Sequence, residues 1–108
     1  MENKGLGKTS IGMEANMAAL LSYLLGFITG IIFYLAEKEN KFVRFHAMQS
    51  IIVFAVLFVA GFIIGLIPVI NLAFWLAELV LWIVLMVKAY QGEKFKLPVV
   101  GDLAEKNA

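Results

Sequence analysis

One carboxylate lies inside a long apolar run, and it is the side chain in this sequence most suited to chemistry. Glu78 is the only charged residue between Arg44 and Lys88 if His46 is taken as neutral. An ionised carboxylate at the centre of a membrane-spanning helix costs roughly 3 kcal/mol on insertion scales, so such groups are neutral, hydrogen-bonded or paired. Lys88 is too far away to pair with Glu78, because ten helical residues span about 15 Å.

Two interpretations of Glu78 follow from its position. Depth matching along the predicted helices places it level with Ser22 and Tyr23, and in a structural role it would hydrogen-bond to one of them or to a second protomer. In a functional role it would be a proton or cation site in a pore or transporter, because acids within membrane segments often mark such pathways. A proton relay would need a second titratable group at that depth, so the structural role is the preferred prediction.

No set of side chains has the composition of an enzyme active site. Ser50 and His46 are four residues apart, as a nucleophile and its base could be on a helix, yet no acid is placed to orient them. The sequence has one histidine, no cysteine and no metal-ligand spacing. Its net charge of +1 with scattered basic residues argues against nucleic acid. We therefore predict a protein that is not an enzyme and uses no metal or cofactor.

The elements that position these residues are predicted to be helices in a membrane. Of the 108 residues 62% are apolar, and residues 15–36 and 45–77 carry no charge when the histidine is neutral. A bilayer span needs about 20 such residues. The sequence thus predicts an all-α integral membrane protein, a single domain with three transmembrane helices in an up-down-up bundle. The predicted segments are a mobile tail (1–14), a helix (15–36), an interfacial amphipathic hinge (37–46), a helix (47–66), a turn (67–71), a helix (72–91) and a surface tail (92–108).

Small residues recur at four-residue spacing in all three predicted helices. This spacing lines them up on one helix face and lets another backbone approach closely. The predicted packing residues are Ala18, Ser22, Gly26, Gly30, Gly61, Gly65, Ala73 and Ala77. They favour a homo-oligomer or association with other membrane proteins.

The hinge combines charges with aromatic residues, as segments at a membrane surface do. Its functional motif is predicted to comprise Phe42, Arg44, Phe45, His46, Gln49 and Ser50. The two phenylalanines are placed to anchor at headgroup level. For the histidine the preferred interpretation is that the start of a membrane helix tolerates polar groups. The alternative is that the arginine and the histidine bind lipid phosphates or the last carbonyls of the preceding helix. The last three members fall on one helix face and form a polar stripe that enters the membrane.

The placement of basic residues predicts the orientation. Lys4 and Lys8 lie in the N-terminal tail, seven other basic residues lie in the hinge or near the C-terminus, and the second turn has none. Because cytoplasmic loops carry the excess of Lys and Arg, the rule predicts an N-terminus outside the cell membrane and a cytoplasmic hinge and C-terminus.

Three stretches carry a family resemblance. They are Ala-Leu-Leu-Ser-Tyr at 19–23 with Gly26 and Gly30, Phe-Val-Arg-Phe-His-Ala-Met-Gln-Ser at 42–50, and Gly92 with Leu97-Pro98 and Gly101. The chain resembles an uncharacterised family of small prokaryotic multi-pass membrane proteins related to the twenty-kilodalton import component of the inner chloroplast envelope. The resemblance implies a helical membrane protein and, through the plastid relatives, a link to translocation. Those relatives look like four-span proteins, whereas this sequence offers three spans.

The predicted function is that of a non-enzymatic membrane subunit that forms oligomers or complexes, with a link to translocation. Its expected partners are membrane lipid and other copies or other membrane proteins. Two alternatives remain open. One is a small channel or proton-coupled transporter that uses Glu78. The other is a lipid-binding or sensing protein that works at the membrane surface through the hinge.

Overall fold

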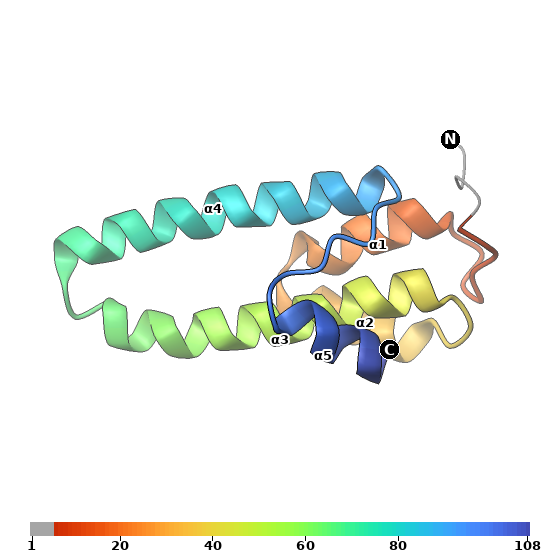
Figure 1. The fold of residues 1–108 in the computed structure, drawn as a ribbon, viewed down its shortest axis with the longest axis horizontal. Coiled ribbons are helices and arrows are strands. Elements are labelled where there is room, and N and C mark those ends of the chain that lie inside the picture. The colour runs from red at the N-terminus through yellow and green to blue at the C-terminus, as the bar shows by residue number, and fades with distance from the viewer. Residues whose placement is uncertain (1–5) are drawn as a thin grey trace.

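The computed structural model describes residues 6–108, and all regular structure in this part of the chain is helical (Figure 1). The all-α class predicted from the sequence is confirmed for these residues. Lys4 and the first residues of the predicted mobile tail lie outside the described range. The five helices are α1 (Ala15–Leu24), α2 (Phe27–Ala36), α3 (Lys41–Ile64), α4 (Pro68–Tyr90) and α5 (Val100–Asn107).

Two long antiparallel helices, α3 and α4, run along a molecule that is 45 Å long (Figure 1). The side chain of Asn40 caps α3 by accepting the Val43 N–H at 3.1 Å. Pro68 starts α4, where its missing N–H and fixed φ suit the first helical turn. With 24 and 23 residues, both helices are long and apolar enough to cross a membrane.

The continuous helix predicted over residues 15–36 is wrong, because the chain turns back at Leu25 and Gly26. Gly26 has φ 64°, a left-handed conformation that glycine adopts at little cost. The hydroxyl of Thr29 fills the break: it accepts the Leu25 N–H at 3.1 Å and lies 3.2 Å from the Ser22 carbonyl oxygen. The result is a helical hairpin of α1 and α2. Each has ten residues, about 15 Å, or half of the apolar thickness of a bilayer.

The described residues therefore contain two candidate spans rather than the three predicted. Other predicted boundaries also shift. The hinge shortens to residues 37–40 because α3 begins at Lys41, and the second turn shortens to 65–67 because α4 begins at Pro68. The predicted surface tail contains α5, which packs against α3.

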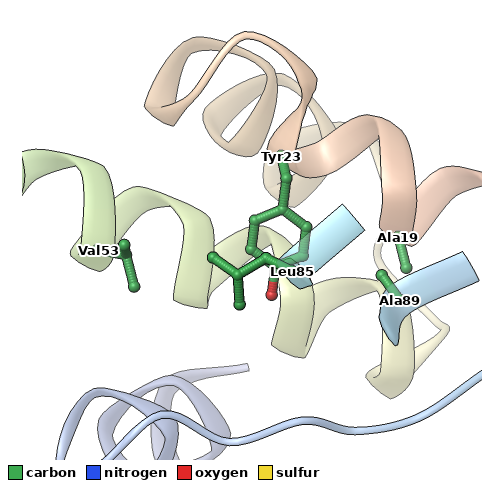
Figure 2. Packing of buried hydrophobic residues seen from close by; sticks show 5 residues of the cluster. All are labelled: Ala19, Tyr23, Val53, Leu85 and Ala89. Carbon is green, nitrogen blue, oxygen red and sulfur yellow. The ribbon is translucent and has the colours of Figure 1, made fainter. Parts of the chain in front are cut away.

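The hydrophobic core lies where the hairpin meets the long helices. Helix α1 packs against both α3 and α4, and α2 packs against α3 (Figure 1). Tyr23 of α1 points towards Leu85 of α4 in the middle of this core (Figure 2). The cluster of fully or nearly fully buried residues comprises Ala19, Tyr23, Val53, Leu85 and Ala89.

The N-terminal segment lies at the same end of the molecule as the hinge. Ser10 donates its backbone N–H to the Glu37 carboxylate at 2.8 Å, and the Asn40 amide donates to the Leu6 carbonyl at 2.9 Å. These contacts contradict the prediction that tail and hinge lie on opposite sides of a membrane. The hairpin brings the chain back to the end from which it started.

The molecule thus divides along its length into two regions. We call residues 6–53 and 83–108 the packed half, because the hairpin, α5 and the tails surround the long helices there. We call residues 54–82 the bare half, because it consists of the ends of α3 and α4 and the turn between them (Figure 1). Glu78 is the only charged residue in the bare half.

Candidate functional site

A buried polar network joins α1 to α3 in the packed half. Gln49 donates from Nε2 to the Tyr23 hydroxyl at 2.9 Å, and that hydroxyl lies 2.6 Å from His46 Nδ1. The opposite ring nitrogen, Nε2, lies 2.9 Å from the Glu93 carbonyl oxygen, which can only accept. Nε2 therefore carries the proton, and Nδ1 accepts from the Tyr23 hydroxyl. All three side chains are fully buried.

The other side of this network is the segment that follows α4, residues 93–97, which we call the C-terminal strap. Gln49 donates to the Phe95 carbonyl at 2.9 Å and accepts the Leu97 N–H at 3.0 Å. Together with the Glu93 contact, these bonds use the strap's backbone polar groups as partners for α3. The strap was predicted as a surface tail, and its binding to the polar stripe of α3 was not anticipated.

A second network closes the hinge around a carboxylate. Glu37 accepts hydrogen bonds from the backbone N–H groups of Ser10, Glu39 and Asn40 at 2.8 to 3.0 Å. The Ser10 hydroxyl donates to it as well, at 2.9 Å. Burial alone would raise the pKa of Glu37, but these donors stabilise the ionised form and lower the pKa to about 2. The carboxylate is therefore an anionic clamp between the N-terminal segment and the hinge.

Arg44 closes the end of α2. Its Nη1 donates to the carbonyl oxygens of Tyr34 and Glu37 at 2.9 and 2.7 Å, and its guanidinium lies 4.1 Å from the centre of the Tyr34 ring. Cations at a helix C-terminus satisfy its free carbonyls and interact favourably with its dipole. One sequence alternative, that Arg44 binds the last carbonyls of the preceding helix, is confirmed.

Glu78 lies apart from both networks. The side chains of Ser22 and Tyr23, its predicted partners, bond instead to Ala18 and to His46 and Gln49. Within residues 6–108 the Glu78 carboxylate has no hydrogen bond or ion pair. It faces the space between α3 and α4, where it borders two grooves of about 320 and 210 Å³.

Comparison with known proteins places this arrangement in a family. Residues 8–104 match the family model of the magnetosome magnetite crystal formation protein family. The chain belongs to this family. No solved structure matches the chain.

Archaeal relatives of the chain are named as membrane proteins. A UPF0132 membrane protein of Methanocaldococcus jannaschii is 55% identical over 104 residues, which cover 94% of this chain and 94% of the relative. A UPF0132 membrane protein of Archaeoglobus fulgidus is 51% identical over 98 residues, covering 87% of this chain and 95% of the relative. The resemblance to a family of small prokaryotic membrane proteins is confirmed. The comparisons give no plastid import protein.

In this protein the residues of the hinge motif mainly make contacts inside the fold and are not placed as membrane anchors. Phe45 was predicted to lie at headgroup level, but it is fully buried, with its ring 5.0 Å from that of His46. Phe42 is half-buried, and the centre of its ring lies 4.6 Å from that of the same imidazole. Ser50 donates to the Gly26 carbonyl at 2.9 Å and so holds the break between α1 and α2 against α3.

The predicted small packing residues divide between the two halves. In the packed half Ala18, Ser22 and Gly30 are buried, and a Cβ added at Gly30 would lie 3.0 Å from the Ala47 carbonyl oxygen. In the bare half Ala73 and Ala77 are exposed, Gly61 faces Phe74 of α4, and Gly65 ends α3. The helix break at Gly26 separates what was predicted to be one stripe of small residues.

The described residues form two hydrogen-bonded polar networks, and Glu78 lies outside both of them. No three His, Asp or Glu side chains of residues 6–108 come together as a metal site would require. Ser50 and His46 bond to different partners, so they form no nucleophile and base pair. Glu78 takes part in neither network, so its carboxylate is the candidate for a chemical role.

Proposed function

We propose that this protein is a non-enzymatic integral membrane subunit in which α3 and α4 cross the bilayer and the α1–α2 hairpin enters it from one side to mid-depth. The lengths of the helices support this arrangement, because about 20 apolar residues cross a bilayer and ten do not. A chain break at membrane depth needs its backbone groups satisfied by protein. Thr29 and Ser50 provide this at Leu25 and Gly26.

The distribution of charge supports one orientation. No lysine or arginine occurs in residues 45–87, and the basic residues that the structure describes all lie in the packed half. By the positive-inside rule, the hinge, the N-terminal segment and the C-terminal region then face the cytoplasm. The turn at residues 65–67 reaches the outer surface. We propose this orientation in place of the one predicted from the sequence, in which the N-terminus lies outside the cell.

The role that we propose is assembly with a second copy of the chain. The observation that supports assembly is an uncovered face of α3 in the bare half. The hairpin leaves this face free, because α2 begins at Phe27 and does not run along the second part of α3. That face forms an apolar depression of about 480 Å³, lined by Ala55, Val56, Val59, Ala60 and Ile63. The two alanines let a second helix approach closely, and a second copy presents the same face.

Single-cysteine variants test orientation and assembly together, since the chain has no cysteine of its own. In Thr9→Cys and Leu66→Cys, a membrane-impermeant maleimide should label the first only in inverted vesicles and the second only in right-side-out vesicles. Labelling of both from the same side would contradict the two-span orientation.

For assembly, Val59→Cys and Val80→Cys form a matched pair, because both valines are 61% exposed but lie on α3 and α4. Mild oxidation in native membranes should give a disulfide-linked dimer with Val59→Cys and little with Val80→Cys. Preferential cross-linking at Val80, on the α4 face that carries Ala73 and Ala77, would overturn the α3 interface. Failure of both variants to cross-link would count against assembly.

The alternative functions predicted from the sequence differ in how well the described contacts support them. A sensor that binds lipid phosphate through Arg44 is less favoured, because its Nη1 already bonds two carbonyl oxygens of the chain. The translocation link rests on resemblance alone. The magnetite chemistry in the family's description finds no support in the side chains of residues 6–108. A channel or transporter that uses Glu78 gains support, because that carboxylate has no hydrogen bond or ion pair within residues 6–108.

A further inference from the structure

The two grooves beside Glu78 are lined by side chains of both long helices. Apart from the Glu78 carboxylate and the indole N–H groups, their linings are apolar. On one side the carboxylate borders a groove with Leu57, Phe58, Gly61 and Phe62 of α3. On the other side it borders a groove with Phe54 of α3 and Trp75, Leu79 and Trp82 of α4. One acid is thus shared by two aromatic-walled grooves in the middle of a long apolar segment.

No basic residue within residues 6–108 pairs with this carboxylate. The nearest basic residue on α4 is Lys88, ten residues away, or about 15 Å along the helix. Lys88 already pairs with Glu93 at 3.1 Å. On α3 the nearest is Arg44, which is committed to the end of α2. A second copy brings no basic residue to this depth either, because residues 45–87 contain none. The remaining partners are a proton or a cation that comes from outside.

The lining selects the kind of cation. Small metal ions take several oxygen ligands, and Glu78 supplies the only carboxylate or carbonyl side chain in either groove. Aromatic faces attract organic cations, and Trp does so best. Both tryptophans of the sequence lie in the same groove as Glu78. Trp82 is held in place by donating its indole N–H to the Tyr23 carbonyl at 2.7 Å, whereas Trp75 is 58% exposed.

We propose that Glu78 and the aromatic side chains around it form a binding site for an organic cation with an apolar or aromatic body, such as a quaternary ammonium or phosphonium ion. The carboxylate is the counter-ion, Trp75 and Trp82 contact the cation through their ring faces, and the leucines and phenylalanines contact its apolar body. Such a ligand reaches the grooves through the lipid, because both open on the surface of the bare half. The site lies on the opposite face of α3 from the proposed contact between copies and does not depend on it.

Tetraphenylphosphonium and tetraphenylborate provide a matched pair of probes, because they share shape and size and differ in the sign of their charge. The two tryptophans provide the signal, since both line the site. In lipid nanodiscs, tetraphenylphosphonium should change the tryptophan fluorescence of the full chain saturably, and tetraphenylborate should not. An equal saturable response to both probes would show partition into an apolar surface and would overturn the proposal.

The decisive variant is Glu78→Gln, which keeps the size of the side chain and removes its charge. It should weaken tetraphenylphosphonium binding roughly tenfold or more, as the loss of a charge partner away from water requires. Glu39→Gln removes the same charge from an exposed position in the hinge and should leave binding unchanged. Equal affinity in the native protein and Glu78→Gln would overturn the site.

A second variant guards against a folding defect in the first. Trp75→Leu removes an exposed ring that makes no hydrogen bond within residues 6–108, and Trp82 remains as the reporter. This change should weaken binding roughly threefold or more through the loss of a cation–π contact. Unchanged affinity would remove Trp75 from the site, and with Glu78→Gln also unchanged the proposal fails.

Discussion

The two halves of this molecule differ in whether their polar side chains have hydrogen-bond partners. In the packed half, buried side chains such as Tyr23, His46 and Gln49 bond to one another and to the backbone of the C-terminal strap. Among residues 6–108, only Glu14 Oε2 and Asn16 Oδ1 are buried side-chain atoms without a partner. In the bare half the one charged side chain, Glu78, has no hydrogen bond or ion pair within residues 6–108, and large apolar side chains are exposed. The packed half thus pairs most of its buried polar groups within the chain, whereas the charge of the bare half is unpaired within the described residues.

This difference indicates which residues determine stability and which are available for association or binding. A satisfied polar network fixes a unique arrangement, since every broken bond leaves a buried group unpaired. An exposed apolar pair of helices is fixed by lipid, by a second copy or by a ligand. We therefore expect substitutions in the packed half to change stability, and substitutions in the bare half to change association and binding. Three predictions test this division, from the largest expected effect to the smallest.

The largest effect is expected for Gln49→Leu. This change leaves the Phe95 carbonyl and the Leu97 N–H without their side-chain partner, and buried groups that lose their bonds cost about 1 to 3 kcal/mol each. The free energy of unfolding should fall by about 3 kcal/mol. It can be measured by titrating the detergent-solubilised protein with SDS and following its helical circular dichroism.

The matched control for Gln49→Leu lies in the bare half. Phe62 is 70% exposed, so Phe62→Ala should change the free energy of unfolding by only about 0.5 kcal/mol. Similar losses in the two variants would remove the distinction between the halves.

The second effect concerns the hinge and has a pH dependence. The folded-state pKa of Glu37 is lowered from its ordinary value of 4.5 to about 2, so its ionised form stabilises the fold. This contribution is fully present above pH 4.5 and is lost as the pH falls towards 2. Glu37→Gln should lower the free energy of unfolding at pH 7 by about 2 kcal/mol, because the backbone donors lose a charged acceptor.

The same SDS titration, repeated between pH 7 and pH 2.5, measures this dependence. The stability gap between the native protein and Glu37→Gln should narrow below pH 4.5. A gap that stays constant down to pH 2.5 would show that the carboxylate does not clamp the hinge. Glu39→Gln, at a neighbouring exposed position, should leave the profile unchanged.

The smallest effect on stability is expected at two glycines, Gly30 and Gly61, that leave different amounts of space for a side chain. A Cβ at Gly30 would lie 3.0 Å from the Ala47 carbonyl oxygen and 3.1 Å from the Ser50 side chain, whereas one at Gly61 would meet only Phe74, at an ordinary 3.9 Å. Gly30→Ala should therefore lower the free energy of unfolding by about 1 kcal/mol through overpacking between α2 and α3. Gly61→Ala should be tolerated or slightly stabilising, since alanine favours helix over glycine. The reverse order would show that α2 does not approach α3 as closely as described.

The sequence predicts the helical class and the two long helices because their signal is local. Runs of uncharged residues suffice for α3 and α4, although Pro68 was predicted to lie in the turn and instead begins α4. The polar face of α3 also follows from spacing, since His46, Gln49 and Ser50 lie together and are buried as a group. The last carbonyls of the preceding helix are close in sequence to Arg44, so this contact could be predicted too.

What the sequence does not reveal depends on contacts between distant residues. Gly26 fits a continuous helix as well as a turn, and its left-handed conformation is supported by Ser50, 24 residues later. Phe45 is of a residue type that anchors at membrane interfaces, but its ring is fully buried beside His46 and the Lys94 ammonium of the strap. The separation of Glu78 from Ser22 and Tyr23 could not be seen, because depth matching assumed a straight first helix.

The C-terminal strap has a consequence for the order of events during synthesis. The partners of Gln49 lie 46 and 48 residues further along the chain, and the ribosome makes them after α4. The α1–α2 hairpin, α3 and α4 are thus all translated before the polar stripe of α3 can be closed. During that interval Gln49 lacks its strap partners. The strap therefore completes the packed half only after α1 to α4 have been made, and a nascent chain arrested before Leu97 should lack the Leu97 hydrogen bond.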